Sequence, residues 1–150
     1  MITNGGPSIP KVFIDGGAIG NPGIAGAGIC FEFQGKPRIG LFEYLGRQTN
    51  NYAEYSALLL ALEYALKHGF LELEVYSDSQ LMVRQILGEY RVKNNVLQTL
   101  HQKAQILIRR FKHFRIHHIP RTQNREADSL VKRAQKSRSS GEVTYQLEVE

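Results

Sequence analysis

Cysteine, tryptophan and long apolar runs are scarce or missing in this chain of 150 residues. The one cysteine, Cys30, excludes an internal disulfide and is typical of a reducing compartment, so we expect a cytoplasmic protein. No run of 18 apolar residues occurs, which excludes a membrane-spanning helix and any membrane partner that depends on one. The first residues, MITNGGPSIPK, lack the basic start and apolar core of a secretory signal, so none is expected.

Several catalytic signatures are also missing. The chain has no Walker sequence and no G-x-S-x-G, which removes support for a P-loop enzyme or a serine hydrolase. Its five histidines show no zinc-binding spacing. The stretch DGGAIGNPGIAGAG resembles a dinucleotide-binding loop only superficially, because its glycines lead into a strand-like segment and open no helix.

Charge is unevenly distributed along the chain. Residues 103–138 contain eleven Lys and Arg but two acids, a net charge of +9, whereas the remainder carries −4. A basic run alone is more often a solvated surface than a binding site. Beside a group of acids, however, it suits a polyanion that must approach a metal site.

Hydrophobic periodicity predicts one mixed α/β domain with strands and helices in the order βββαβααβα. The expected strands are 11–15, 24–33, 38–46, 71–76 and 114–119, and the expected helices are 50–68, 79–87, 95–110 and 124–137. Asn50 or Asn51 is the expected cap of the first helix. We place the domain at 1–138, with a core at about 11–136. The tail, 139–150, alternates from Val143 to Val149 and is either an edge strand or a disordered or partner-bound segment.

Four carboxylates stand out by their positions. Asp15 ends an apolar run before a glycine-rich turn, Asp78 closes a second apolar run, and Glu54 and Asp128 lie in helical patterns. Each alone has an ordinary explanation: a turn residue, a helix cap, a favourable charge on a helix dipole, or a solvated acid. Together they predict a divalent-metal site, because clustered acids repel unless a cation joins them.

Four motifs resemble the type 1 ribonuclease H family: D-G-G-A-x-G-N-P-G-x-A-G-x-G at 15–28, T-N-N-x-A-E at 49–54, Y-S-D-S-Q at 76–80 and N-x-x-A-D at 124–128. They occur in the family's order, and the resemblance spans roughly 11–136. It implies a ribonuclease H-like fold with a central five-stranded mixed sheet flanked by helices. In that sheet the first and fourth strands are parallel neighbours, which would bring Asp15 and Asp78 together.

The resemblance also implies an activity. Asp15, Glu54, Asp78 and Asp128 would hold two Mg²⁺ or Mn²⁺ ions for endonucleolytic cleavage of the RNA strand of an RNA–DNA hybrid, leaving 5′-phosphate and 3′-hydroxyl ends. The implied substrate contacts are Gly16, Asn21, Arg47, Thr49, Asn50, Asn51 and Gln80. The expected partner is an RNA–DNA hybrid, with double-stranded RNA also open, and a monomer is expected.

Two departures from the family matter. The segment GEYRVKNN at 88–95 is too short for the basic, tryptophan-bearing protrusion of many bacterial members, so this is a short form. Its hybrid affinity is expected either to be weaker or to rest on the basic region 103–138. The family's mobile histidine before the last acid has no clear counterpart: Arg121 is the stronger candidate and His118 the lesser one. A weakly active or inactive module that binds hybrid or double-stranded RNA, another nuclease on this fold and an interaction protein stay open as alternatives.

Overall fold

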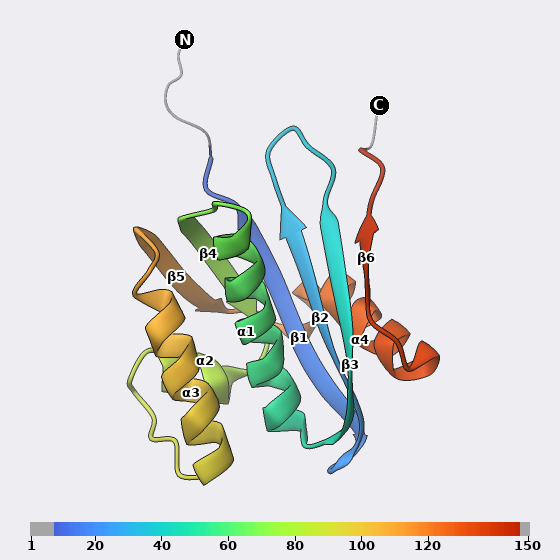
Figure 1. The fold of residues 1–150 in the computed structure, drawn as a ribbon, viewed down its shortest axis with the longest axis vertical. Helices are drawn as coiled ribbons and strands as arrows, with labels where there is room; N and C mark the ends of the chain where they lie inside the picture. Colours follow the sequence, from blue (N-terminus) through green and yellow to red (C-terminus); the bar gives the residue numbers. More distant parts are fainter. Residues whose placement is uncertain (1–7, 148–150) are drawn as a thin grey trace.

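The structure, a computed structural model, describes residues 8–147 and holds one six-stranded sheet with helices on both faces (Figure 1). The expectations for residues 1–7 and for Val149 lie outside the described residues. The elements in chain order are β1 (Lys11–Gly20), β2 (Gly23–Glu32), β3 (Ile39–Gln48), α1 (Asn50–Lys67), β4 (Glu72–Ser77), α2 (Gln80–Ile86), α3 (Asn95–Ile108), β5 (His113–His118), a short 3₁₀ turn (Arg121–Gln123), α4 (Arg125–Ser137) and β6 (Gly141–Thr144).

The strand order is β5-β4-β1-β2-β3-β6. β1 runs parallel to β4, with Ile14 beside Ser77, and antiparallel to β2. β5 is parallel to β4, and β3 is antiparallel to β2. The predicted order of the first nine elements and the α/β class are therefore confirmed, and so is the pairing of the first and fourth strands.

β1 is twice as long as expected, and the prediction that a glycine-rich turn follows Asp15 is wrong. The strand continues through Gly20, and Asp15 pairs with Gly28 in the middle of a long hairpin. Small residues recur on both strands of this hairpin, so their backbones can stay paired while helices lie close above them. As a result, Asp15 lies on an extended strand at the point where the neighbouring β4 ends.

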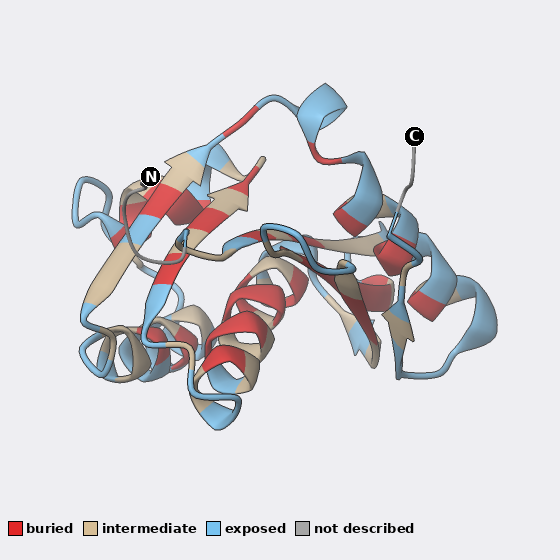
Figure 2. Cartoon of the chain, turned by 90° about the horizontal axis from the view of Figure 1, so that it is seen from above, coloured by how far each residue is buried: buried red, intermediate tan, exposed pale blue. Residues whose placement is uncertain are grey.

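Two glycines let helices approach opposite faces of the sheet. A Cβ added to Gly16 would lie 2.2 Å from the carbonyl carbon of Ala53 in α1, and one added to Gly28 would lie 2.2 Å from the carbonyl oxygen of Ala127 in α4. No real Cβ tolerates such a distance, so both positions require glycine. α1, with α3 beside it, covers one face, and α4 covers the other face over β1, β2 and β3 (Figure 1, Figure 2).

The hydrophobic core lies mainly between the sheet and α1. Its fully buried side chains include Ile14, Ile29, Phe31, Leu58 and Leu62. Burying a side chain of this kind contributes about 1.5–3 kcal/mol. A smaller cluster lies under α4 and contains Cys30, whose burial raises the pKa of its thiol to about 11. Cys30 is therefore an inert core residue.

Helix caps differ from the expectation in one respect. Thr49 caps α1 by accepting a hydrogen bond from the backbone N–H of Tyr52, so the prediction of Asn50 or Asn51 as the cap is wrong. Ser79 caps α2 by accepting a hydrogen bond from the backbone N–H of Met82, so Asp78 is not the cap of this helix. A hydroxyl suits the cap position, and the neighbouring amide and carboxylate groups are then available for other contacts.

The tail adds a sixth strand to the five that were expected. β6 pairs antiparallel with the first half of β3, and Tyr145 beyond it donates its backbone N–H to the carbonyl of Arg38 at 2.9 Å. The strand begins at Gly141, before the alternating residues that suggested it. The domain boundary at residue 138 stays a prediction. Among the described residues, no helix is long and apolar enough to cross a membrane.

Candidate active site

Three carboxylates from distant parts of the chain meet where β4 ends beside β1. Asp15 lies on β1, Asp78 directly follows β4, and Glu54 lies on α1 above the close contact at Gly16. One oxygen from each of the three lies within 4.8 Å of the others. They line a cavity of about 490 Å³. The sequence prediction that Asp15, Glu54 and Asp78 converge is therefore matched by the structure's geometry.

The electrostatics of this cluster are unfavourable without a cation. Burial, and then the nearby charges of Asp78 and Asp128, together raise the pKa of Asp15 to about 8. Burial and then the charges of Asp15 and Asp78 raise the pKa of Glu54 well above its usual range. A hydrogen bond from the backbone of Gly16 acts in the opposite direction on both groups and is too weak to offset the repulsion.

The fourth acid, Asp128, lines the same cavity from α4 but is not one of the three carboxylates whose oxygens lie within 4.8 Å of one another. Its carboxylate lies 3.1 Å from the ammonium of Lys132, one helical turn further along. It remains near enough to raise the pKa of Asp15. Sequence reasoning expected all four acids at one centre. In the structure all four line one cavity: three lie within 4.8 Å of one another, and Asp128 lies close enough to Asp15 for a side-chain hydrogen bond.

Backbone and amide groups fix the orientation of the triad. The N–H of Gly16 donates to Glu54 Oε1 at 2.8 Å, so the helix carboxylate is tied to the strand. Asn124, which is buried, donates from Nδ2 to the carbonyl of Ile14 at 2.8 Å and to Asp78 Oδ2 at 3.2 Å. Its Oδ1 is buried and has no hydrogen-bond partner within residues 8–147.

Asn124 and Lys132 were not predicted as site residues. Asn124 is the first residue of the motif N-x-x-A-D, but the motif alone does not indicate that the Asn124 side chain links Ile14 on β1 with Asp78 after β4. Lys132 follows Asp128 by four residues, a spacing at which side chains on a helix meet. That spacing was the one available signal for the lysine.

The donor set suits a hard divalent cation. Each of the three acids offers carboxylate oxygen, and Mg²⁺, Mn²⁺ and Ca²⁺ prefer such ligands. The described residues offer no histidine or cysteine to the triad, which argues against zinc. A cation would offset both the burial and the mutual repulsion of these carboxylates, which together raise the pKa values of Asp15 and Glu54, so the residues present fit a metal centre.

The structure distinguishes between Arg121 and His118, the two candidates for the position of the family's mobile histidine. Arg121 lies in the 3₁₀ turn before α4 and lines the cavity of the carboxylates. His118, at the end of β5, is exposed and lies outside the set of residues that line this cavity. The geometry favours Arg121 for contact with a bound substrate.

The predicted substrate contacts form a polar margin beside the triad. Asn50 Oδ1 accepts from the N–H of Ala18 at 2.8 Å, and Asn21 Oδ1 accepts from the N–H of Asn50 at 3.0 Å.

Four other predicted contacts are exposed. Arg47 pairs in register with Ile24 on the neighbouring strand and is exposed, as is Thr49. Asn51 and Gln80 are exposed at the first turns of α1 and α2. Asn50 and Gly16 line the cavity itself.

Comparisons with known proteins agree with this geometry. The family model described as reverse transcriptase-like matches residues 14–134. Ribonuclease HI of Halobacterium salinarum is 37% identical over 123 residues, which are 81% of this chain and 62% of that protein. A bifunctional protein of Mycobacterium tuberculosis is 39% identical over 120 residues, 78% of this chain and 33% of that protein. The chain thus spans less than two thirds of the length of these curated relatives.

Solved structures match most of the chain. The crystal structure of RNase H1 from Halobacterium salinarum is 34% identical, with a TM-score of 0.80, and the match covers 87% of this chain and 99% of that one. LC11-RNase H1, solved in complex with an RNA/DNA hybrid, is 37% identical, also with a TM-score of 0.80, and the match covers 86% of this chain and 98% of that one.

Proposed function

The chain belongs to the type 1 ribonuclease H family, and we propose that it is a metal-dependent endoribonuclease that hydrolyses the RNA strand of RNA–DNA hybrids. One observation carries the proposal above the family resemblance: Asp15, Glu54 and Asp78 place carboxylate oxygens within 4.8 Å of one another, and burial together with neighbouring charges raises the pKa values of Asp15 and Glu54. Buried carboxylates held in such an unfavourable arrangement indicate a functional site, and a bound cation would offset their repulsion.

The proposed cofactor is Mg²⁺ or Mn²⁺, two ions with substrate bound. Asp15, Glu54 and Asp78 would hold one ion, and Asp15 with Asp128 would hold the other. When bound, the ions supply activation of a water molecule and stabilisation of the departing 3′-oxygen. The products would carry 5′-phosphate and 3′-hydroxyl ends.

The chain's own residues have distinct tasks in this proposal. Glu54 is held by the N–H of Gly16, so its position is set by the helix–strand contact. Lys132 neutralises Asp128 until the substrate complex forms. Arg121 lines the cavity and would contact the anionic backbone of the strand being cut, where a guanidinium provides charge and two donors.

The polar margin would position the hybrid. Arg47, Asn21 and Thr49 would hold a phosphate of the DNA strand, and Asn50, Asn51 and Gln80 would contact bases and sugars in the groove. Glu54 and the backbone near Gly16 would meet ribose 2′-hydroxyls, the group that distinguishes RNA from DNA. We expect a monomer, because a single chain supplies every residue of this site.

Cleavage of labelled RNA–DNA, RNA–RNA and DNA–DNA duplexes, with and without Mg²⁺ or Mn²⁺, tests the proposal. We expect metal-dependent cuts in the RNA strand of the hybrid and none with Asp78→Asn. Tight hybrid binding without cleavage by the unaltered protein would instead indicate a binding module, and cuts in RNA–RNA would extend the substrate class to double-stranded RNA.

The role of Arg121 has its own test. Arg121→Ala should lower kcat, while His118→Ala, a change of similar size outside the cavity, should leave kcat near that of the unaltered protein. Equal turnover in Arg121→Ala would remove the arginine from the mechanism.

A further inference from the structure

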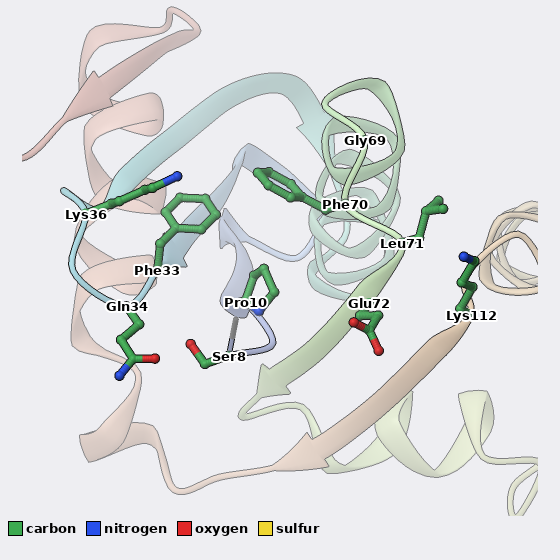
Figure 3. A pocket seen from close by; sticks show the side chains of 10 residues that line it. All are labelled: Ser8, Pro10, Phe33, Gln34, Lys36, Gly69, Phe70, Leu71, Glu72 and Lys112. Carbon is green, nitrogen blue, oxygen red and sulfur yellow. The ribbon is translucent and has the colours of Figure 1, made fainter. Parts of the chain in front are cut away.

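A second cavity, of about 450 Å³, lies at the other end of the sheet (Figure 3). Its walls include the rings of Phe33 and Phe70, with centroids 5.3 Å apart and planes inclined by 40°, and Pro10 lies below them in the view of Figure 3. Lys36 lies on the Phe33 side, and Glu72 and Lys112 lie on the opposite side (Figure 3). The cavity therefore combines aromatic walls with two flexible cations.

This cavity is distinct from the carboxylate site. Pro10 directly precedes β1, and Glu72 begins β4, so both lie where the two parallel strands start. The acids lie further along the chain from these strand starts, and the six steps from Glu72 to Asp78 span about 20 Å at roughly 3.3 Å per residue. The two cavities share no lining residue.

The basic run that the sequence showed is divided between these two ends. Lys132 lines the carboxylate cavity from α4, whereas Lys112 lines the distal one, next to exposed Arg109 and Arg110 at the end of α3. Within residues 8–147, no carboxylate lies within ion-pair distance of the ammonium of Lys36 or Lys112. These cations are thus available to an anionic ligand, and they lie outside the cavity of the carboxylates.

We propose that this distal cavity binds one nucleotide unit of a single-stranded nucleic acid. A base would stack on the rings of Phe33 and Phe70, and the phosphates on either side of it would meet Lys36 and Lys112. Glu72 would accept a hydrogen bond from the amino or imino group of the base, or from the sugar. Stacking on aromatic side chains beside a basic margin is the general way in which proteins hold single strands without reading their sequence.

A single strand fits better than a duplex. The cavity has aromatic walls on which an open base can stack, whereas a base within a duplex already stacks on its neighbours and exposes only its edges. The unpaired flank of a hybrid, or a separate strand, offers an open base together with phosphates. The carboxylate end could hold a hybrid at the same time, because it uses none of these residues.

Binding of a short labelled oligothymidylate, followed by fluorescence anisotropy over a range of salt concentrations, tests the proposal. Lys36→Glu and Lys112→Glu should each weaken binding by about threefold to tenfold and reduce the slope of log affinity against log salt by about 0.7. Phe33→Leu, which retains most of the apolar volume, should weaken binding by about tenfold through loss of stacking. Lys136→Glu makes the same charge change on α4 and should retain the affinity of the unaltered protein.

Other results would overturn the proposal. Equal losses in Lys136→Glu and Lys112→Glu would show a general effect of net charge. Competition by inorganic phosphate as strong as by thymidine monophosphate would exclude a base contact, whereas stronger competition by the nucleotide supports it. A dimer in solution that Leu71→Glu dissociates would assign the cavity to a second copy of this chain.

A loading experiment separates this proposal from the proposed function. Asp78→Asn saturated with unlabelled blunt hybrid should still bind the oligothymidylate, and complete displacement by the hybrid would contradict a separate site. Failure of the unaltered protein to cleave hybrids would contradict the proposed function and leave the anisotropy result intact.

Discussion

The two ends of the parallel strands β1 and β4 are built in opposite ways. At one end, three carboxylates are crowded together, and a backbone N–H and a buried amide hold two of them in place. At the other end, two lysines stand at the margin of an apolar cavity without a partner among the described carboxylates. One end repels its own charges and is rigid, and the other has free charges on flexible side chains.

This difference shows what each end can do. Metal-assisted chemistry depends on placing ligands within a few tenths of an ångström, so its ligands lie on a strand and a helix in close contact. Capture of a flexible polyanion tolerates variable geometry, and lysine side chains supply that tolerance. The predictions below would contradict or refine this contrast, and they run from the largest expected effect to the smallest.

Asp15→Asn should lower the rate of hybrid cleavage by more than about 10³-fold. The substitution removes the charge shared by both proposed metal positions, and stabilisation of transition-state charge by a metal is worth several kcal/mol. Single-turnover assays over a range of Mg²⁺ concentrations measure the loss. Activity within about tenfold of the unaltered protein would show that Asp15 is not a shared ligand.

The same variant should be more stable than the unaltered protein in the absence of metal. The pKa of Asp15 is raised to about 8, so the protonated group contributes stability that is fully present below about pH 3.8 and lost as the pH rises through 8. The advantage of Asp15→Asn in the free energy of unfolding should therefore increase from pH 5 to pH 8 and reach a few kcal/mol. Urea unfolding in a chelator measures it.

Two controls accompany that measurement. Glu89→Gln, at an exposed ion pair with Arg84, should change the free energy of unfolding by less than about 0.5 kcal/mol at every pH. Added Mg²⁺ should stabilise the unaltered protein and have little effect on Asp15→Asn. An advantage that does not vary with pH would mean that burial and the neighbouring acids do not raise the pKa of Asp15.

Gly16→Ala should destabilise the protein by about 2–3 kcal/mol and reduce activity as well. The new Cβ would meet the backbone of Ala53 at 2.2 Å, so α1 must move away from β1 and carry Glu54 with it. Gly35→Ala serves as a comparison, because no atom lies within 4 Å of its added Cβ and its positive φ accounts for any loss. Thermal unfolding and kcat together separate the two effects.

Asn124→Ala should lower kcat/KM by about 10–100-fold and raise the Mg²⁺ concentration needed for half-maximal activity. Its amide holds Asp78, and loss of a group that orients a metal ligand has this effect in other metal sites. Gln85→Ala removes another buried amide, bonded to Tyr55, and should lower stability without moving the Mg²⁺ requirement. An unchanged Mg²⁺ requirement in Asn124→Ala would reduce the residue to a structural role.

The sequence predicted the order of elements and the three acids of the triad because both leave local signals. Apolar periodicity marks the core faces, and the motifs mark the acids. The sequence could not show features that depend on contacts formed only in the folded protein. The length of β1 depends on its pairing with β2, the cap at Thr49 depends on competition among adjacent polar residues, and the link from Asn124 to Asp78 joins residues 46 apart. The distal cavity has no motif at all, since its residues come together through the fold alone.

The edge strand β6 should show the smallest effect, and that effect should be purely structural. The guanidinium of Arg38 lies 4.9 Å from the ring centroid of Tyr145, an interaction worth about 0.5–1 kcal/mol, and the ring contacts the small cluster under α4. Tyr145→Ala should therefore lower the free energy of unfolding by about 1 kcal/mol, whereas Tyr145→Phe should retain most of it. Cleavage per folded molecule should be equal in both, because the carboxylates depend on β1, β4 and α1. A fall in kcat with unchanged stability would show that this edge of the sheet affects catalysis. The carboxylate site would then not be independent of the edge strand.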